Sequence, residues 1–212
     1  EGKTWVEDPG SIAPEPVAEE STHQTAAAVM APVSAVQQLA IAPVSADAML
    51  KRCATVQWNP DRRIAIFMGA NSQVAPGMEE FRTLRARLFQ MRAKKPLKTI
   101  LVSSALPDEG KSFVSGNLAQ VFARQRGGRT LLLDCDLRKP QLHDMFGAPK
   151  GPGISEYLQG KVDEFSIIQR SNYEDLFFIP GGETTPHTPE LIGNGRLKTL
   201  LHHLGPLFSW IV

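Results

Sequence analysis

The sequence of 212 residues has few of the features that mark secreted, membrane-spanning or nucleic-acid-binding chains. Its only two cysteines, Cys53 and Cys135, have the spacing of neither a metal site nor a disulfide framework, so we expect a reducing, cytoplasmic compartment. The sequence shows no secretory signal and no run of about 18 apolar residues that would span a bilayer. The net charge of +1 is too small to indicate a DNA or RNA partner.

Aromatic residues and basic charge are scarce at the start of the chain. Trp5 is the only aromatic residue before Trp58, and residues 1–50 carry seven acids and one Lys, whereas residues 51–212 carry 22 bases and 15 acids. A stretch rich in Ala, Pro, Val, Ser and Glu buries too little apolar surface to offset the entropy of ordering it. We therefore predict a disordered tail or linker over residues 1–57 and a connecting segment over residues 58–78. A mildly basic domain over residues 79–212, suited to an anionic ligand, would follow.

Predicted strands and helices alternate along residues 79–212. Apolar residues at three- and four-residue spacing predict an amphipathic helix from Glu79. Nearly continuous apolar runs predict strands buried on both faces at residues 97–104 and 129–136, and further strands at 175–182 and 207–212. Helices are predicted between them. This order indicates a doubly wound, mostly parallel α/β sheet that is incomplete at its C-terminal end.

The segment ALPDEGKS, residues 105–112, has the spacing of a phosphate-binding loop, G-x-x-x-x-G-K-[ST], with Ala105 in place of the first Gly. Such a loop between a strand and a helix aims backbone N–H groups at a β-phosphate. Lys111 would lie between the β- and γ-phosphates, Ser112 would bind Mg²⁺ through its hydroxyl, and Gly110 would let the backbone come close. The alternative is a surface turn that contains GKS by chance.

The loop residues expected around the phosphates are Pro107, Asp108, Glu109, Gly110, Lys111, Ser112 and Phe113. Asp108 is unusual among them because a carboxylate repels phosphate. We expect its side chain to point outward.

Two acidic residues, Asp134 and Asp136, follow the second predicted strand. Their spacing predicts that both project from one face, at the edge of the sheet where the loop also lies. Paired carboxylates there could hold Mg²⁺ or accept a proton from an attacking hydroxyl. The alternative is that one Asp caps the next segment and the other is solvated.

Taken together, these motifs resemble those of the bacterial tyrosine kinases of capsule and exopolysaccharide synthesis. That family has a P-loop of the type P-x-E-G-K-[ST], matched by residues 107–112, and then three apolar residues and D-x-D-x-R, matched by residues 131–138. The segment EEFRTLR adds E-x-x-R-x-x-R, with Glu79, Arg82 and Arg85, which in that family lies at a subunit contact. The resemblance covers about residues 79–212.

The resemblance implies a P-loop fold that uses ATP and Mg²⁺ to phosphorylate tyrosine hydroxyls between subunits of a homo-oligomer. Lys111 would stabilise the developing phosphate charge, Asp134 would assist Mg²⁺ or act as the base, and Asp136 would hold the metal shell. It also implies a cytoplasmic location at the inner face of the membrane. The link to the membrane would be a polysaccharide co-polymerase or activator, or a segment outside this chain, and nucleic acid would not be a partner.

Two features of that family are absent from the sequence. The family's third motif is an apolar strand ending in Asp, and this chain stops at Val212 before any such Asp. A tyrosine-rich C-terminal tail is also lacking, since only Tyr157 and Tyr173 occur. We therefore expect weak or no activity of these 212 residues alone.

Two other functions stay open from the residues. One is an ATPase switch of the partition or septum-site type, although those proteins carry an extra Lys where this chain has Leu106. The other is a nucleotide-sensing regulator of a polysaccharide machine that performs no catalysis.

Overall fold

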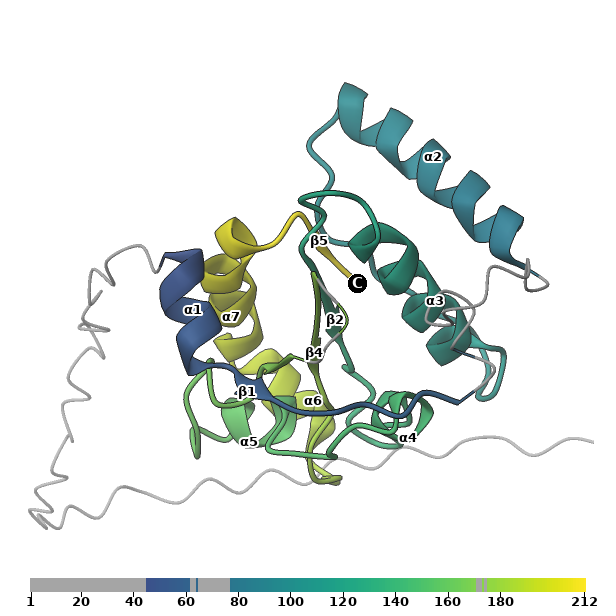
Figure 1. Cartoon of the computed structure of the whole chain (residues 1–212). Coiled ribbons are helices and arrows are strands. Elements are labelled where there is room, and N and C mark those ends of the chain that lie inside the picture. The colour runs from purple at the N-terminus through teal and green to yellow at the C-terminus, as the bar shows by residue number, and fades with distance from the viewer. Residues whose placement is uncertain (1–44, 62–63, 65–76, 171–172, 174) are drawn as a thin grey trace, which may run out of the picture. The chain divides into compact units, whose positions relative to one another are not determined.

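The computed structural model describes residues 45–61, 64, 77–170, 173 and 175–212, and the structural statements below concern these residues. In chain order its elements are α1 (Ala46–Arg52), β1 (Ala54–Thr55), α2 (Met78–Lys94), α3 (Lys111–Ala123), β2 (Thr130–Leu133), α4 (Leu142–Phe146), α5 (Ile154–Leu158), β3 (Gln169–Arg170), β4 (Leu176–Ile179), α6 (Thr188–Gly193), α7 (Arg196–Leu204), the 3₁₀ turn η2 (Gly205–Leu207) and β5 (Trp210–Ile211) (Figure 1).

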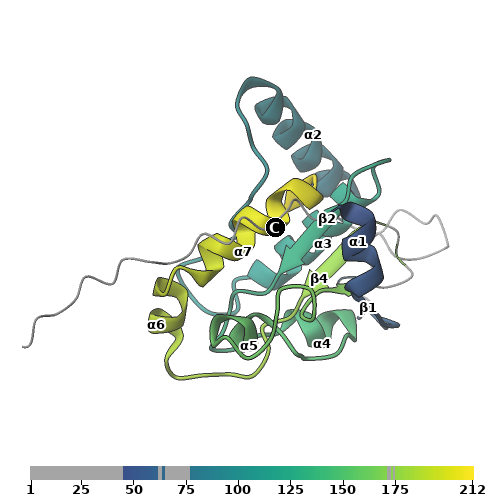
Figure 2. The same cartoon turned by 90° about the vertical axis from the view of Figure 1, so that its left-hand side faces the viewer.

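A five-stranded sheet forms the centre, in the order β1-β3-β4-β2-β5. Every neighbouring pair is parallel except β3 and β4, which are antiparallel. Helices α1 and α7 lie on one side of the sheet and α3 lies on the other (Figures 1 and 2). The prediction of a doubly wound, mostly parallel α/β fold is therefore confirmed.

The central strands send alternate side chains into two separate cores, because side chains along a strand point to opposite faces. The core beneath α3 receives Leu132, Phe178 and Trp210. The core beneath α7 receives Leu131, Phe177 and Ile211. Burial of both faces explains why these strands read as continuous apolar runs rather than as alternating patterns.

Helix α2 packs on α3 and on the start of β5. The Phe89 ring lies 5.3 Å from that of Trp210, and the Arg92 guanidinium lies 4.7 Å above the same indole ring. The helix is confirmed, but Met91, which the apolar spacing places with Phe81, is 57% exposed. Although α2 is 17 residues long, no helix in the described part of the chain has the length and apolar character needed to cross a membrane.

The prediction of a buried strand over residues 97–104 is wrong. Within this segment only Thr99 forms a β-bridge, to Ile211, and Leu101 is 84% exposed. The segment lies beyond β5, so it meets the sheet along one side and no described strand covers the other. An apolar run does not by itself distinguish a central position from an edge position.

The predicted tail over residues 1–57 is wrong for residues 45–57. Ser45 caps α1 by accepting a hydrogen bond from the Ala48 N–H at 3.2 Å, and Met49 and Cys53 are buried against the core beneath α7. Strand β1 then pairs with β3. Residues 1–44, and residues 62–63 and 65–76 of the predicted connecting segment, lie outside the described residues.

The two cysteines give a direct test of this packing. Burial raises the pKa of the Cys53 thiol to about 11 and that of the Cys135 thiol to about 12. Because the thiolate is the reactive form, both side chains should resist labelling by a thiol-specific reagent at pH 8 and react fully after denaturation. Rapid labelling of either thiol in the folded chain, followed by absorbance, would contradict the packing described here.

Candidate functional site

The turn from the 105–110 loop into α3 depends on Gly110. Its backbone adopts a φ of 90°, in the left-handed region that side-chain-bearing residues rarely occupy. No side chain caps the helix at this point. The first N–H groups of α3 therefore keep their donor capacity for a ligand at the helix N-terminus, where the helix dipole also favours negative charge.

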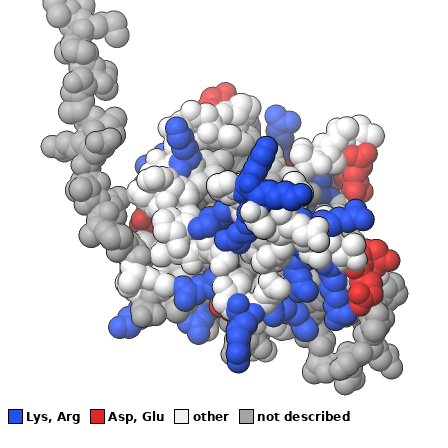
Figure 3. Space-filling view, turned by 90° about the horizontal axis from the view of Figure 1, so that it is seen from above, with Lys and Arg blue, Asp and Glu red and all other residues white. Residues whose placement is uncertain are grey.

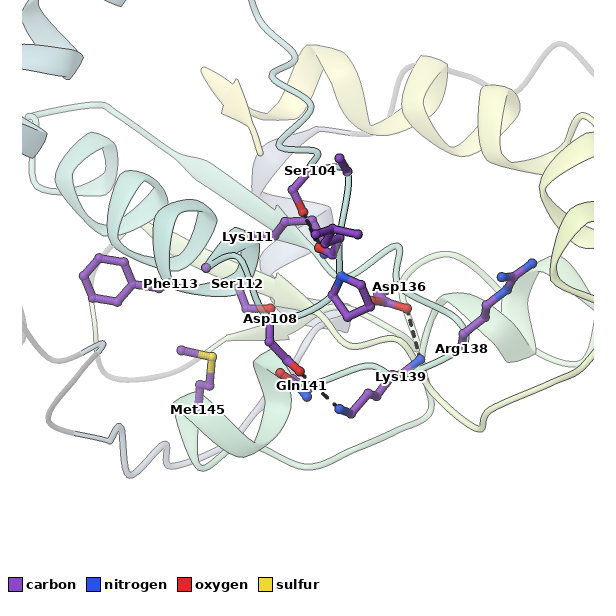
Figure 4. Close-up of a pocket in the computed structure, with 14 residues that line it drawn as sticks. Ser104, Asp108, Lys111, Ser112, Phe113, Asp136, Arg138, Lys139, Gln141 and Met145 are labelled. Atoms are coloured by element: carbon purple, nitrogen blue, oxygen red, sulfur yellow. Dashed lines mark hydrogen bonds and ion pairs between the residues drawn. The ribbon is translucent and has the colours of Figure 1, made fainter.

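A pocket of about 570 Å³ opens in front of this turn (Figure 4). Its volume is typical of small-molecule sites. One wall is the loop with the start of α3, and the second wall is the segment from the end of β2 into α4. The lining residues are Ser104, Ala105, Leu106, Pro107, Asp108, Gly110, Lys111, Ser112, Phe113, Asp136, Arg138, Lys139, Gln141 and Met145.

Lys111 and Ser112 both line the pocket, as the loop motif predicts. The Lys111 Nζ donates a hydrogen bond to the Ser104 Oγ at 3.1 Å, and that hydroxyl donates to the Leu106 carbonyl at 2.9 Å. The ammonium is thus held across the loop. This arrangement concentrates positive charge at the helix N-terminus, where an anionic group would bind.

Glu109 does not line the pocket, although the sequence places it among the residues around the phosphates. Its carboxylate accepts a hydrogen bond from the Leu106 N–H at 3.0 Å. This bond is the largest cause of the lowered pKa of Glu109. The side chain therefore closes the loop from outside the pocket.

Asp108 lines the pocket with its backbone in the left-handed region, at a φ of 61°. Few residues other than Gly adopt this conformation, but Asp tolerates it. Its carboxylate faces the second wall, where its Oδ1 lies 4.0 Å from the Lys139 Nζ (Figure 4). The side chain is 74% exposed, so it does point toward solvent, but from the rim of the pocket and on the side of Lys139.

Asp134 is buried and does not line the pocket. Its two carboxylate oxygens accept hydrogen bonds from the backbone N–H groups of Asp136 and Leu142, each at 3.1 Å. Burial raises the pKa of this carboxyl, and the two hydrogen bonds oppose the rise. The Asp134 N–H still donates to the Ile179 carbonyl of β4 at 3.0 Å, while its side chain accepts from Leu142, the first residue of α4, as in the alternative that one Asp caps the next segment.

Asp136 is exposed and lines the pocket, and its Oδ1 accepts a hydrogen bond from the Lys139 N–H at 3.0 Å. Within the described residues, no group of three or more His, Cys, Asp or Glu side chains is placed to hold a metal ion. Mg²⁺, however, is often held by one or two carboxylates together with substrate phosphates and water. The oxygen donors of Ser112 and Asp136 fit Mg²⁺ in that way, together with a nucleotide.

Sequence patterns gave no indication of Gln141 and Met145, which line the pocket from the second wall. These residues belong to no motif. Only Asp134 points to them indirectly, because it accepts a hydrogen bond from Leu142 at the start of α4, between Gln141 and Met145.

The basic charge of the domain is not concentrated in the pocket, where Lys111, Arg138 and Lys139 accompany two carboxylates. Seen from above, Lys and Arg are scattered across the face of the domain, and Asp and Glu lie mostly toward its margins (Figure 3). Outside the pocket lining, basic residues gather in the last turn of α2 and in the segments that follow α2 and α3: Arg92, Lys94, Lys95, Lys98, Arg124, Arg126 and Arg129. Net charge is therefore no guide to the ligand of this pocket.

The E-x-x-R-x-x-R residues of α2 divide between two roles. Arg85 donates a hydrogen bond to the Val121 carbonyl of α3 at 3.1 Å, which ties the two helices together. Glu79 and Arg82 pair with each other on the exposed side of α2. The predicted subunit contact stays a prediction, with Glu79 and Arg82 on the exposed surface.

The parallel sheet, the loop that runs into α3 and the pocket at that junction together define an α/β domain of the P-loop type. No family model matches the chain. The putative tyrosine-protein kinase CapB of Staphylococcus aureus is 32% identical over 134 residues, which are 63% of this chain and 58% of CapB. The tyrosine-protein kinase YwqD of Bacillus subtilis is also 32% identical over 134 residues, which are 63% of this chain and 56% of YwqD.

The kinase domain of the Escherichia coli tyrosine kinase ETK superposes with a TM-score of 0.64 at 26% identity, over 79% of this chain and 72% of that domain. The chain is therefore similar to bacterial tyrosine kinases in sequence, and its fold is that of the ETK kinase domain. It spans somewhat more than half the length of CapB and YwqD.

The different positions of the two Asp residues lead to a prediction. Asp134→Asn replaces one of two buried acceptors by an N–H donor, and this leaves a backbone N–H without its partner. The free energy of unfolding should fall by about 1–3 kcal/mol. Asp136→Asn retains an oxygen acceptor at an exposed site and should change that free energy by less than about 0.5 kcal/mol. Urea denaturation of both variants provides the measurement, and equal losses would contradict these positions.

Proposed function

We propose that the protein is an ATP-dependent protein tyrosine kinase that acts in the regulation of capsule or exopolysaccharide synthesis. The observation that carries the proposal is the convergence of Lys111, Ser112 and Asp136 on one pocket at the N-terminus of α3. The names of the relatives support the choice of tyrosine kinase among P-loop activities.

In the proposed reaction the chain contributes position and charge rather than covalent chemistry. The N–H groups at the start of α3 would bind the ATP phosphates, and the Lys111 ammonium would stabilise charge on the transferred γ-phosphoryl group. Ser112 and Asp136 would hold Mg²⁺, which when bound neutralises phosphate charge. Asp134 would act as a positioning residue, because it holds the segment that carries Asp136.

The acceptor tyrosine would come from outside the described surface of this domain. Tyr157 is only 4% exposed, and the Arg196 guanidinium lies 4.8 Å above its ring. Tyr173 is half-buried and stacks on Trp58. Because neither side chain is fully exposed, we expect phosphorylation between subunits to use a tyrosine of another segment or of another protein.

The exposed side of α2 supports the proposal that the protein forms a homo-oligomer. Glu79 and Arg82 lie there, together with the partly exposed apolar side chains of Leu84 and Met91. A membrane-bound activator of polysaccharide export, at the cytoplasmic face, is proposed from the family resemblance.

The exposed position of Leu106 favours a kinase over an ATPase of the partition type. Leu106 lies on the rim of the pocket and is 64% exposed. The partition ATPases carry a Lys at this position, and an apolar side chain cannot supply its charge.

Replacing Lys111 tests the kinase proposal. Lys111→Met keeps a similar stem but removes the ammonium, so phosphotyrosine on the full-length protein in the producing organism should fall at least about a hundredfold. The measurement is a phosphotyrosine immunoblot, with exposed Lys150→Met as the matched control. Phosphotyrosine that survives in Lys111→Met would contradict the proposal, and its absence from the unaltered protein would favour the non-catalytic regulator.

Reversing one charge on α2 tests the oligomer. Arg82→Glu adds a third acid to the exposed turn that holds Glu79 and Glu80, and should shift the protein from oligomer toward monomer in analytical ultracentrifugation, because like charges then meet across the contact. Lys198→Glu, on the exposed part of α7, is the control and should leave the mass unchanged. An unchanged mass for Arg82→Glu would place the contact elsewhere.

A further inference from the structure

We propose that Lys139 binds a phosphate of ATP, and that its ion pair with Asp108 competes with this binding. In the structure the two side chains form an ion pair across the pocket mouth, and the Lys139 ammonium exchanges the Asp108 carboxylate for a phosphate when ATP binds. This inference rests on the proposed binding of ATP.

The ion pair joins the two walls of the pocket. Asp108 belongs to the phosphate loop, Lys139 belongs to the segment between β2 and α4, and both line the same cavity (Figure 4). The Asp108 Oδ1 and the Lys139 Nζ are 4.0 Å apart, and the two side chains are 74% and 68% exposed. A pair so long and so exposed contributes little free energy, so it can exchange partners readily.

Lys139 is anchored at its backbone and free to move at its tip. Its N–H donates to the Asp136 Oδ1 at 3.0 Å, and the next residue, Pro140, is buried. Asp134 fixes the same segment on both sides of Lys139. The long Lys stem can therefore carry its ammonium from the rim toward a phosphate without a movement of the backbone.

Asp108 opposes nucleotide binding in this exchange. Its backbone conformation keeps the carboxylate at the rim, where it would repel a triphosphate once Lys139 has left it. ATP carries more negative charge than one carboxylate and so competes for the ammonium. Asp108 thus weakens nucleotide binding and Lys139 strengthens it, which would adjust affinity so that nucleotide can be released.

A simpler alternative is that Asp108 repels phosphate independently of Lys139. The two schemes differ in a double-mutant cycle, because only the exchange makes the effect of Asp108 depend on Lys139. Asp108→Asn is a clean variant for this purpose, since Asn also tolerates the left-handed backbone and only the charge is lost.

The experiment is calorimetric titration of the full chain with ATP and Mg²⁺ at low salt. Asp108→Asn should tighten binding about three- to tenfold, and Lys139→Met, which keeps a similar stem, should weaken it by about the same factor. In the Lys139→Met background, the gain from Asp108→Asn should shrink at least about twofold. Thermal melting of each variant should match that of the unaltered chain, because both side chains are exposed.

Two controls separate this inference from the proposed function. Lys150→Met breaks another exposed ion pair, with Glu183 at 2.9 Å and away from the pocket lining, and should leave the affinity unchanged. If the unaltered chain does not bind ATP, the proposed function and this inference fail together. If Lys111→Met abolishes binding but Lys139→Met has no effect, or Asp108→Asn gives equal gains in both backgrounds, only this inference is overturned.

Discussion

The second wall of the pocket depends on the buried carboxylate of Asp134. This one side chain joins the end of β2 to the loop behind it and to the first residue of α4 through two backbone hydrogen bonds. Burial disfavours its charge, and the two N–H donors offset that cost. Without this link, Asp136 and Lys139 would have no fixed position opposite the phosphate loop. The D-x-D motif thus combines one residue that builds the site with one that faces it.

In the phosphate loop, too, neighbouring residues have different structural roles. Glu109 closes the loop from outside, Gly110 supplies the left-handed turn, and Lys111 lines the pocket. Glu109 and Lys111 are only two residues apart, but their side chains leave the backbone in different directions, so one closes the loop and the other lines the pocket. Asp108, on the same loop, faces Lys139 across the pocket.

Sequence periodicity was sufficient for the elements that build most of the two cores. β2 and β4 are buried on both faces and α2 and α3 carry clear spacing, so their patterns were readable. Residues 97–104 were misassigned because an apolar run does not reveal whether a neighbouring strand exists on each side. α1 was missed because Met49 and Cys53 are buried by a core that distant residues encode. The loop had a motif, whereas Gln141 and Met145 reach the site through tertiary contacts alone.

The central claim is that the junction of the loop and α3 binds the phosphates of ATP while the Asp136 segment faces them. Backbone amide NMR of the full chain during titration with ATP and Mg²⁺ tests it most directly. The account predicts saturable shifts of the Gly110, Lys111 and Ser112 amide signals, together with that of Asp136, at one common dissociation constant. Shifts confined to other parts of the chain, or no shifts at millimolar ATP, would contradict it.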